Sequence, residues 1–441
     1  MYKTLDAPLA VHVEVNTGCN QRCCHCYNFW RSDKPKLDLR LSELLATRIA
    51  DQLAANKVFH VILTGGEPLI NIETLIFFMS ELSKRNITFG LNSNLVLLSK
   101  ENAEKLKAVG LRVVLTSLLS YDETTHDSLS GVKGSFQCVV RGINIARIVG
   151  IRIAVNMVVM KENLSHVQKT GEFSHKLGAF AFSATRVMPP RSLSYQSLED
   201  FSLVWNDVYS VVKQLLALRN TCLKLDSLVP YPSCFFDSEE SWSLLGRRTC
   251  SAGKTSLAIA SDGAIRACPH YEKMYGTLAT EDLTDVWARM TEWRNGSLLP
   301  KACRSCEFLK LCGGGCRVAS SGENICNEDP IMSDALDKTF KSREFLKHRK
   351  ISPVVADNAK LRVKNVCRFR KDKVLGIINT GGIKNTFVSN ETLAVFEDLQ
   401  TKKSIFTPKF LREMKMITME NSQYLSFLGE LVERGVLEQV T

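Results

Sequence analysis

Residues 9–186 alternate short, β-branched apolar runs with longer stretches of helical periodicity. Apolar runs of the length of buried strands lie at 9–15, 58–63, 87–92, 112–117, 151–158 and 179–185. Between them, apolar residues recur at helical spacing over 41–55, 71–85, 100–109, 136–149 and 163–177. Six strand–helix units in series predict an α/β fold with a parallel sheet, either a partial barrel or a doubly wound sheet.

Three of the predicted helices stop at a glycine that lies between two apolar residues. These glycines are Gly110, Gly150 and Gly178. Glycine fits the left-handed position that ends a helix before the next strand. The sequence therefore marks helix ends as well as helix interiors.

The pattern changes after residue 186. Residues 187–249 are less regular, with one helix expected near 198–218, and the cysteine-rich stretch 250–326 shows little helical periodicity. We expect that stretch to be rich in loops, with bound metal supplying much of its cohesion. Helical character returns at about 331–348.

Residues 355–441 form a separate small unit, the C-terminal module. Its pattern predicts strands at 362–369, 373–379 and 384–388, followed by three helical stretches that end at 427–437. A chain of 441 residues has room for two or three domains. We place their bounds at 1–220, 221–350 and 355–441.

Composition adds a location and excludes a few classes of protein. The chain is 45% hydrophobic, and no apolar run reaches the about 18 residues of a membrane span. The first residues lack the apolar core of a signal peptide, so we expect a cytoplasmic protein. The net charge of +11 suits acidic partners but is also typical of a solvated surface.

Ten of the 15 cysteines fall into tight motifs. They are Cys19, Cys23, Cys26, Cys250, Cys268, Cys303, Cys306, Cys312, Cys316 and Cys326. Thiolates at such spacings converge on soft metal centres, and the pattern favours iron–sulfur clusters over a disulfide scaffold. Zinc is the alternative, because C-x2-C pairs also serve zinc ribbons. Cys138, Cys222 and Cys367 lie among apolar residues, which predicts buried thiols.

Polar motifs follow the predicted strands at their carboxyl ends. Cys19–Cys26 follows the first strand, Gly65-Gly66-Glu67-Pro68 the second and Asn94 the third. Ser117 ends the fourth strand and Arg186 the sixth. Parallel βα folds place their chemistry on these loops, so we expect one active site at the top of a barrel.

Cys19-x3-Cys23-x2-Cys26, with GGEP about forty residues later, resembles the signature of the radical S-adenosylmethionine (radical SAM) superfamily. These three cysteines are called the N-terminal set. The resemblance implies a 4Fe–4S cluster with one iron open to SAM, whose cleavage yields a radical that takes a hydrogen from the substrate. Cys24 is out of register with this signature.

The same resemblance assigns the SAM contacts. Gly65, Gly66 and Glu67 match the motif for the SAM amino group, and Ser117 with His126-Asp127 resembles the segment that contacts the ribose and the carboxylate. The family often has an arginine soon after that pair, where this chain has Ser130. Arg152 or Arg186 are the alternatives that we consider for the carboxylate. His25, Asn94 and Asn156 are further candidate contacts.

The cysteines of 250–326 match the SPASM extension, which binds up to two auxiliary 4Fe–4S clusters. By that resemblance Cys250, Cys268 and Cys316 form the first auxiliary set, and Cys234 is the candidate for its fourth ligand. The second auxiliary set is Cys303, Cys306, Cys312 and Cys326. The resemblance thus implies three 4Fe–4S clusters, one of which binds SAM.

The C-terminal module resembles the peptide-recognition domain of quinone-cofactor biosynthesis, a small winged-helix fold. Domains of this type bind a leader peptide as an added strand. A winged helix can also bind DNA, which the basic run 362–373 permits, or can serve as a plain docking domain. The whole chain then reads as a partial (βα)6 radical SAM barrel, a loop-rich SPASM domain and a small α+β winged-helix domain.

Such enzymes modify peptides, so the resemblance implies a radical SAM maturase that installs a thioether, carbon–carbon or ether crosslink in a ribosomally made precursor. Its partners would be a precursor with a leader and an electron donor such as flavodoxin or ferredoxin, with no membrane or nucleic acid. One alternative is a sulfatase-maturing enzyme that makes formylglycine, although that family has an Asp where Pro269 follows Cys268. Another is a zinc-stabilised winged-helix protein that binds nucleic acid.

Overall fold

The six predicted strands form one parallel sheet in the computed structural model, which describes residues 4–28, 39–188, 203–320, 326–332, 354–413 and 421–440. Each strand pairs with its neighbour in sequence, in parallel. The strands are β1 (Ala10–Glu14), β2 (His60–Thr64), β3 (Thr88–Asn92), β4 (Val113–Ser117), β5 (Arg152–Val159) and β6 (Ala181–Arg186). The prediction of these strands is confirmed.

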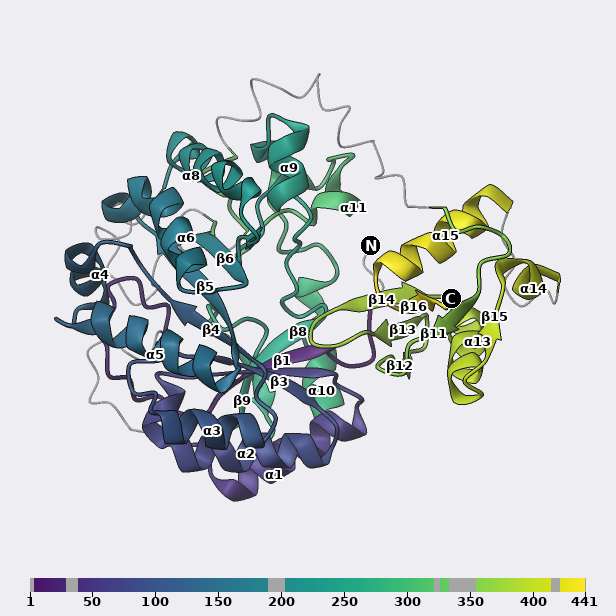
Figure 1. The fold of residues 1–441 in the computed structure, drawn as a ribbon, viewed down its shortest axis with the longest axis horizontal. Helices are drawn as coiled ribbons and strands as arrows, with labels where there is room; N and C mark the ends of the chain where they lie inside the picture. The colour runs from purple at the N-terminus through teal and green to yellow at the C-terminus, as the bar shows by residue number, and fades with distance from the viewer. Residues whose placement is uncertain are drawn as a thin grey trace.

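Helices cover the outer face of this sheet (Figure 1). They are α1 (Glu43–Ala55), α2 (Ile72–Lys84), α3 (Lys100–Ala108), α4 (Glu123–Ser130), α5 (Ser135–Val149) and α6 (Val167–Lys176). Gly110, Gly150 and Gly178 all have positive φ angles just after a helix, as predicted. Helix α4 was not predicted, because its eight residues carry only one large apolar side chain, Leu129.

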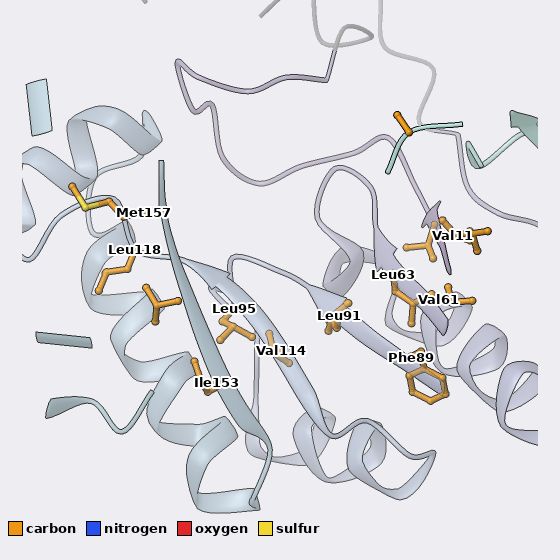
Figure 2. Close-up of a cluster of buried hydrophobic side chains, with 14 of the residues drawn as sticks. Val11, Val61, Leu63, Phe89, Leu91, Leu95, Val114, Leu118, Ile153 and Met157 are labelled. Carbon is orange, nitrogen blue, oxygen red and sulfur yellow. The ribbon is translucent and has the colours of Figure 1, made fainter. Parts of the chain in front are cut away.

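The strands divide their side chains between two faces. Val11 and Val13 of β1 are fully buried against the helices, whereas His12 between them lines a cavity on the inner face. Figure 2 shows part of the outer core, with Val61 and Val114 among the labelled residues. An apolar outer face and a polar inner face are what a barrel with an internal site requires.

The sheet continues beyond the six predicted strands on both sides. Its order is β10-β9-β8-β1-β2-β3-β4-β5-β6-β7. The added strands are β7 (Lys224–Asp226), β8 (Ser256–Ile259), β9 (Ala264–Arg266) and β10 (Met274–Thr277). The cysteine-rich stretch is therefore more regular than expected, since β8 pairs with β1 and extends the barrel sheet itself.

Among the residues that the structure describes, four further α-helices lie between β6 and the module. They are α8 (Trp205–Ala217), α9 (Glu239–Leu245), α10 (Leu283–Ala288) and α11 (Leu309–Cys312). Helix α8 confirms the later part of the helix expected near 198–218. Residues 198–202 and most of the helix expected at 331–348 lie outside the described residues.

The described part of the C-terminal module, residues 354–413 and 421–440, contains two small antiparallel sheets and three α-helices. One sheet has the order β12-β13-β14 and the other β15-β11-β16. The elements are β11 (Leu361–Val363), β12 (Arg368–Lys371), β13 (Gly376–Asn379), β14 (Asn385–Val388), α13 (Asn390–Thr401), β15 (Ile405–Phe406), α14 (Pro408–Glu413), α15 (Asn421–Glu433) and β16 (Leu437–Gln439). The single strand predicted at 362–369 was wrong, because this segment divides into β11 and β12, which belong to different sheets.

The module packs against the base of the barrel, where the strands begin. Leu375 and Ile377 of the module form a buried cluster with Leu5, Leu9 and Phe59, which lie just before β1 and β2. In Figure 1 the module stands beside the barrel, with its β12–β14 sheet nearest to the start of β1. An apolar cluster shared by both parts fixes their relative position.

Two arginines of β12 reinforce this interface. Arg370 is buried and donates to the carbonyl oxygens of Ala7 and Pro8, both at 2.8 Å, while forming an ion pair with Asp372. Arg368 donates to the carbonyl oxygens of Phe59 and Asn86, both at 2.9 Å. The module therefore lies at the opposite end of the strands from the loops that carry the predicted site.

No helix among the described residues is long and apolar enough to cross a membrane.

Candidate active site

A cavity of about 390 Å³ occupies the inner face of the sheet towards the carboxyl ends of its strands. The N-terminal set and the first auxiliary set both line it. The structure thus brings together six predicted cluster ligands that are up to 297 positions apart, from Cys19 to Cys316. The N-terminal set and the first auxiliary set therefore share one cavity.

The loop of the N-terminal set is held by backbone contacts to neighbouring loops. The amide of Glu67 donates to the carbonyl oxygen of Gly18 at 2.7 Å, and the amide of Cys24 donates to that of Leu129 at 3.2 Å. The Cys24 thiol lies 3.6 Å from the same Leu129 oxygen and 3.7 Å from the Met160 sulfur. Cys24 is exposed and is not part of the cavity lining, which agrees with its place outside the signature.

The glycine pair after β2 makes the closest approach to this loop. A Cβ atom at Gly66 would lie 1.9 Å from the carbonyl oxygen of Gly18, and Gly65 has a φ of +152°. Because backbone atoms stand in the way, only glycine fits at Gly66. The backbone of Gly65 and Gly66 can therefore line the cavity beside the N-terminal set.

The Glu67 carboxylate already accepts three protein donors. Its Oε1 accepts from the Leu69 amide at 3.0 Å and from Ser93 Oγ at 2.7 Å, and its Oε2 accepts from the Asn94 amide at 2.8 Å. Burial raises the pKa of Glu67, and these hydrogen bonds oppose the shift. The carboxylate fastens the loop after β2 to the loop after β3, and its pairing with an ammonium group stays a prediction.

His25, Asn94, Ser117 and Asn156 all line the cavity. Asn94 is held by its own neighbours, since its Nδ2 donates to Asn20 Oδ1 at 2.7 Å. Asn156 Oδ1 accepts from Thr185 Oγ1 at 2.6 Å. Their positions are compatible with contacts to a small molecule, and those contacts stay predictions.

His126 and Asp127 lie outside the cavity lining and organise the loops behind it. Nδ1 of His126 accepts from the Leu119 amide at 3.2 Å, and burial lowers its pKa to about 4. Asp127 accepts from the amides of Gly134 and Phe136 at the start of α5. These hydrogen bonds give both residues a structural role that requires no bound ligand.

The two arginines considered for the SAM carboxylate have other partners. Arg152 begins β5, at the base of the barrel, and its guanidinium lies 4.0 Å from the ring centroid of Phe180. Arg186 lies at the cavity, but both of its terminal nitrogens donate to the buried carboxylate of Asp329. Asp329 thereby ties the segment after Cys326 to the end of β6.

The first auxiliary set is a mutually interacting group of thiols. Burial, then the neighbouring Cys316 and Cys250 thiols, raise the pKa of Cys268. Burial and Cys250 raise the pKa of Cys316 to about 11, against the opposing charge of Arg186. Thiols crowded in this way favour a bound metal, which would hold them as thiolates.

The second auxiliary set lies on the segment 303–326. Burial and the nearby Cys312 and Cys306 thiols raise the pKa of Cys303 to about 11. The Cys326 sulfur lies 3.6 Å from the Ser297 carbonyl oxygen. Gly313, Gly314 and Gly315 all have positive φ angles, so the loop between Cys312 and Cys316 turns as only glycines readily allow.

Cys234, the candidate fourth ligand of the first set, lies in a short 3₁₀ turn, Ser233–Phe235. The amide of the preceding Ser233 donates to the Cys312 sulfur at 3.2 Å. This contact places the Cys234 segment against the second set, and ligation of the first set by Cys234 stays a prediction. Cys367 is buried as expected, Cys138 is half-buried, and the prediction for Cys222 was wrong because it is exposed.

A buried polar cluster beside the cavity was not predicted. Glu14 of β1 and Arg266 of β9 form an ion pair, and burial raises the pKa of Glu14 to about 7 although Arg266 opposes the shift. Next to them, the rings of Tyr27 and His270 are stacked, with their centroids 3.9 Å apart. The alternation of apolar and polar residues along β1 could have predicted this cluster, because His12 and Glu14 occupy the positions that face inward.

Among the described residues, no three Cys, His, Asp or Glu side chains surround a point closely enough to hold a single metal ion.

Comparison with known proteins identifies two domain families in this chain. Residues 13–174 match the radical SAM superfamily, and residues 250–307 match the iron–sulfur cluster-binding domain called SPASM. An AdoMet-dependent heme synthase of Methanosarcina barkeri is 26% identical over 349 residues, which cover 75% of this chain and 97% of that protein. The mycofactocin maturase MftC of Mycolicibacterium smegmatis is 27% identical over 339 residues, 74% of this chain and 83% of the relative. A PqqA peptide cyclase of Ruegeria pomeroyi is 25% identical over 359 residues, 76% and 89% of the two chains.

Solved structures show the same fold. Streptococcus suis SuiB bound to the precursor peptide SuiA has a TM-score of 0.58 at 20% identity, covering 74% of this chain and 76% of SuiB. Native anSMEcpe with bound AdoMet has a TM-score of 0.59 at 18% identity, covering 77% and 96% of the two chains. With both domain families matched along the sequence and the fold shared, the chain is a radical SAM enzyme that carries a SPASM iron–sulfur domain.

Proposed function

We propose that this enzyme modifies a ribosomally made peptide, with the peptide core in the barrel cavity and its leader on the C-terminal module. Similarity alone does not decide the substrate, since a heme synthase and two peptide-modifying enzymes match to about the same extent. The observation that carries the peptide proposal is the module, which presents an unpaired strand edge among the described strands and is fixed to the catalytic barrel.

The residues at the cavity fit an iron–sulfur cluster with SAM. The three thiols of the N-terminal set line the cavity together with the Gly65–Gly66 backbone. When bound there, the two groups would supply one-electron chemistry able to remove a hydrogen atom from an unactivated carbon. Glu67 and Asn94 hold the surrounding loops in place, and the Arg186–Asp329 ion pair fixes the wall beside the first auxiliary set. We propose a side-chain crosslink as the product.

We propose three 4Fe–4S clusters, one for each cysteine set. The interactions within Cys250, Cys268 and Cys316, and within Cys303, Cys306 and Cys312, support two separate auxiliary sites. We propose an electron donor such as flavodoxin or ferredoxin as a partner, because the reaction at the N-terminal set consumes reducing equivalents.

The free edge of β14 is the proposed leader site. β14 pairs only with β13 among the described strands. The Thr380 amide donates to the Lys384 carbonyl oxygen at the turn, and hydrogen-bonded pairs alternate along an antiparallel ladder. The amide and carbonyl of Phe387 therefore face away from β13, and its side chain is half-exposed. An extended peptide can pair with such an edge.

Nucleic acid fits the module less well. The basic run 362–373 is largely occupied, since Arg368 and Arg370 bind the base of the barrel and Arg362 forms an ion pair with Glu438. These guanidinium groups are not available for phosphates.

The leader site is tested with short peptides encoded by reading frames beside the gene. Phe387→Pro removes the outward amide, whereas Phe387→Ala removes only the side chain. If main-chain pairing holds the leader, the proline variant should weaken peptide binding more than the alanine variant, with SAM cleavage in the absence of peptide unchanged. Equal affinity for all three proteins would refute the site.

The reaction class is tested on protein reconstituted anaerobically. We expect iron and sulfide, SAM cleavage, and a peptide product that has lost two hydrogens. Loss of sulfur from a cysteine would instead indicate formylglycine formation, and formation of heme would indicate the chemistry named for the Methanosarcina relative. A colourless preparation with zinc and no SAM cleavage would refute the enzyme assignment for this protein.

A further inference from the structure

Arg317 is a buried guanidinium with almost no partners among the described residues. It follows Cys316 directly and is 4% exposed. Its one hydrogen bond runs from Nη1 to the Leu298 carbonyl oxygen, at a long 3.3 Å. Nε and Nη2 are buried and have no hydrogen-bond partner, and Arg317 forms no ion pair with any described residue.

The surroundings of Arg317 contain thiols and a second cation. The positive charge of Arg317 tends to lower the pKa of the Cys303 thiol, which belongs to the second auxiliary set, and the pKa of Lys254. Lys254 in turn interacts with Cys250 and Cys312, so the two cations lie close to both sets. Glu328 acts on Cys303 but does not pair with Arg317.

Gly314, in the loop between Cys312 and Cys316, lies beside the guanidinium of Arg317. A Cβ at Gly314 would lie 3.5 Å from Arg317 Nη2 and 2.8 Å from a methyl carbon of Leu299. The Nη2 end of Arg317 therefore lies next to the loop that joins Cys312 of the second set to Cys316. A free guanidinium beside another cation, with unsatisfied donors in a buried place, is costly unless an anion compensates.

We propose that Arg317 is the counter-charge and hydrogen-bond donor of the cluster held by the second auxiliary set. The donor set fits, since four thiolates around a cluster give a net anion whose sulfur atoms accept hydrogen bonds. A cation and N–H donors next to a cluster favour its reduced form, so Arg317 raises the reduction potential of this cluster. The inference rests on the proposed function in one respect, that this set binds a cluster.

The first test is a redox titration of reconstituted protein, followed by electron paramagnetic resonance. A background with Cys19, Cys23 and Cys26 all changed to Ala leaves only the auxiliary clusters. Arg317→Met should move one of the two midpoint potentials to a more negative value, and Arg317→Lys should move it less, because lysine keeps the charge but loses the planar fork of donors. Unchanged potentials in Arg317→Met would overturn the proposal.

Arg294→Met is the matched control. Arg294 is also a buried arginine of this region, but its Nε donates to the Gly253 carbonyl at 2.6 Å and its Nη2 to that of Trp287 at 2.7 Å. Because its donors are already satisfied by the protein, Arg294→Met should leave both potentials unchanged.

The second test compares thermal stability with and without clusters. Without clusters Arg317 is an uncompensated buried charge, so Arg317→Met should raise the melting temperature of the apoprotein and lower that of the reconstituted protein. Arg294→Met should lower both. A loss of stability in both forms of Arg317→Met would show a purely structural role and overturn the proposal.

The cluster assignment is checked separately by a variant in which Cys303, Cys306 and Cys312 are all changed to Ala. If iron and sulfide content do not fall in this variant, the second set holds no cluster and the proposed function fails at that point. If they do fall while Arg317→Met leaves the potentials unchanged, only the inference about Arg317 fails.

Discussion

At the scale of single residues, the site depends on close backbone approaches that leave no room for substitution. Gly66 is the clearest example, because a Cβ there would lie 1.9 Å from the backbone oxygen of Gly18, which cannot move aside as a side chain could. Gly90 of β3 differs, since the nearest neighbours of a Cβ at that position would be 3.7 Å away.

Gly66→Ala should therefore destabilise the protein by about 3 kcal/mol, the upper end of overpacking costs, and abolish SAM cleavage. Gly90→Ala is the control and should retain SAM cleavage and melt near the wild-type temperature. Urea unfolding and SAM cleavage assays check both; a fully active Gly66→Ala variant would contradict this account of the loop.

His126 predicts a dependence of stability on pH. Its pKa falls from 6.5 to about 4 in the folded protein, chiefly because it is buried, so the unfolded chain takes up the proton first on acidification. The stabilisation is complete above pH 6.5 and is lost as the pH falls towards 4, by up to roughly 3 kcal/mol.

His126→Asn, which keeps an acceptor near the Leu119 amide, should lose less stability than the wild type between these pH values. His175→Asn, at an exposed position in α6, serves as the control and should follow the wild-type profile. Urea unfolding at several pH values measures the difference, and parallel profiles for His126→Asn and the wild type would exclude this role.

The sequence was informative about residues whose spacing is itself the signal. The ten motif cysteines and Gly65-Gly66 could be proposed as site residues because each motif lies within a short stretch of sequence. The partners of Arg186 and Glu14 could not, because Asp329 and Arg266 are 143 and 252 positions away. Only the folded chain brings such charges together.

At the scale of elements, strand and helix periodicity predicted the barrel because most of its helices bury one apolar face. It failed where an element is short or polar. α4 lacks an apolar stripe, and β8, β9 and β10 have only three or four residues each. The division of 362–369 into two strands also depends on pairing partners that lie far along the chain, such as Glu438 opposite Arg362.

Strand β12 supplies the two arginines that bind the module to the barrel. Arg370→Met would leave Asp372 buried without its cation, at a cost of about 3–5 kcal/mol typical of broken buried pairs. Arg362→Met removes a partly exposed pair with Glu438 and should cost about 0–1 kcal/mol.

Urea unfolding measures both variants, and limited proteolysis shows whether the module has come loose. We expect Arg370→Met to release a fragment of the C-terminal module much faster than Arg362→Met does. Similar proteolysis of the two variants would mean that the apolar cluster around Phe59 is sufficient to hold the module.

At the scale of the whole molecule, the enzyme has two ends. The cavity with the predicted cluster ligands lies at the carboxyl ends of the strands, and the module lies at their amino ends, with the sheet between them. Neither the cysteine motifs nor the pattern of the module could predict this arrangement, because it depends on where Leu375 and Ile377 find apolar partners.

If the leader binds β14 as we propose, this separation sets a minimum length for the peptide between its leader and its modified residue. The longest barrel strand, β5, has eight residues, so the sheet is about 26 Å tall at roughly 3.3 Å per residue. A peptide paired with β14 at the base reaches the cavity only by running the height of the barrel, which takes at least about eight extended residues.

Precursors with fewer residues between the β14-binding segment and the modified side chain should bind with normal affinity and remain unmodified. Adding glycine and serine residues to the spacer should restore turnover, because the height of the barrel sets only a lower limit. Modification at an undiminished rate when the spacer is cut to three residues would show that the peptide takes another route.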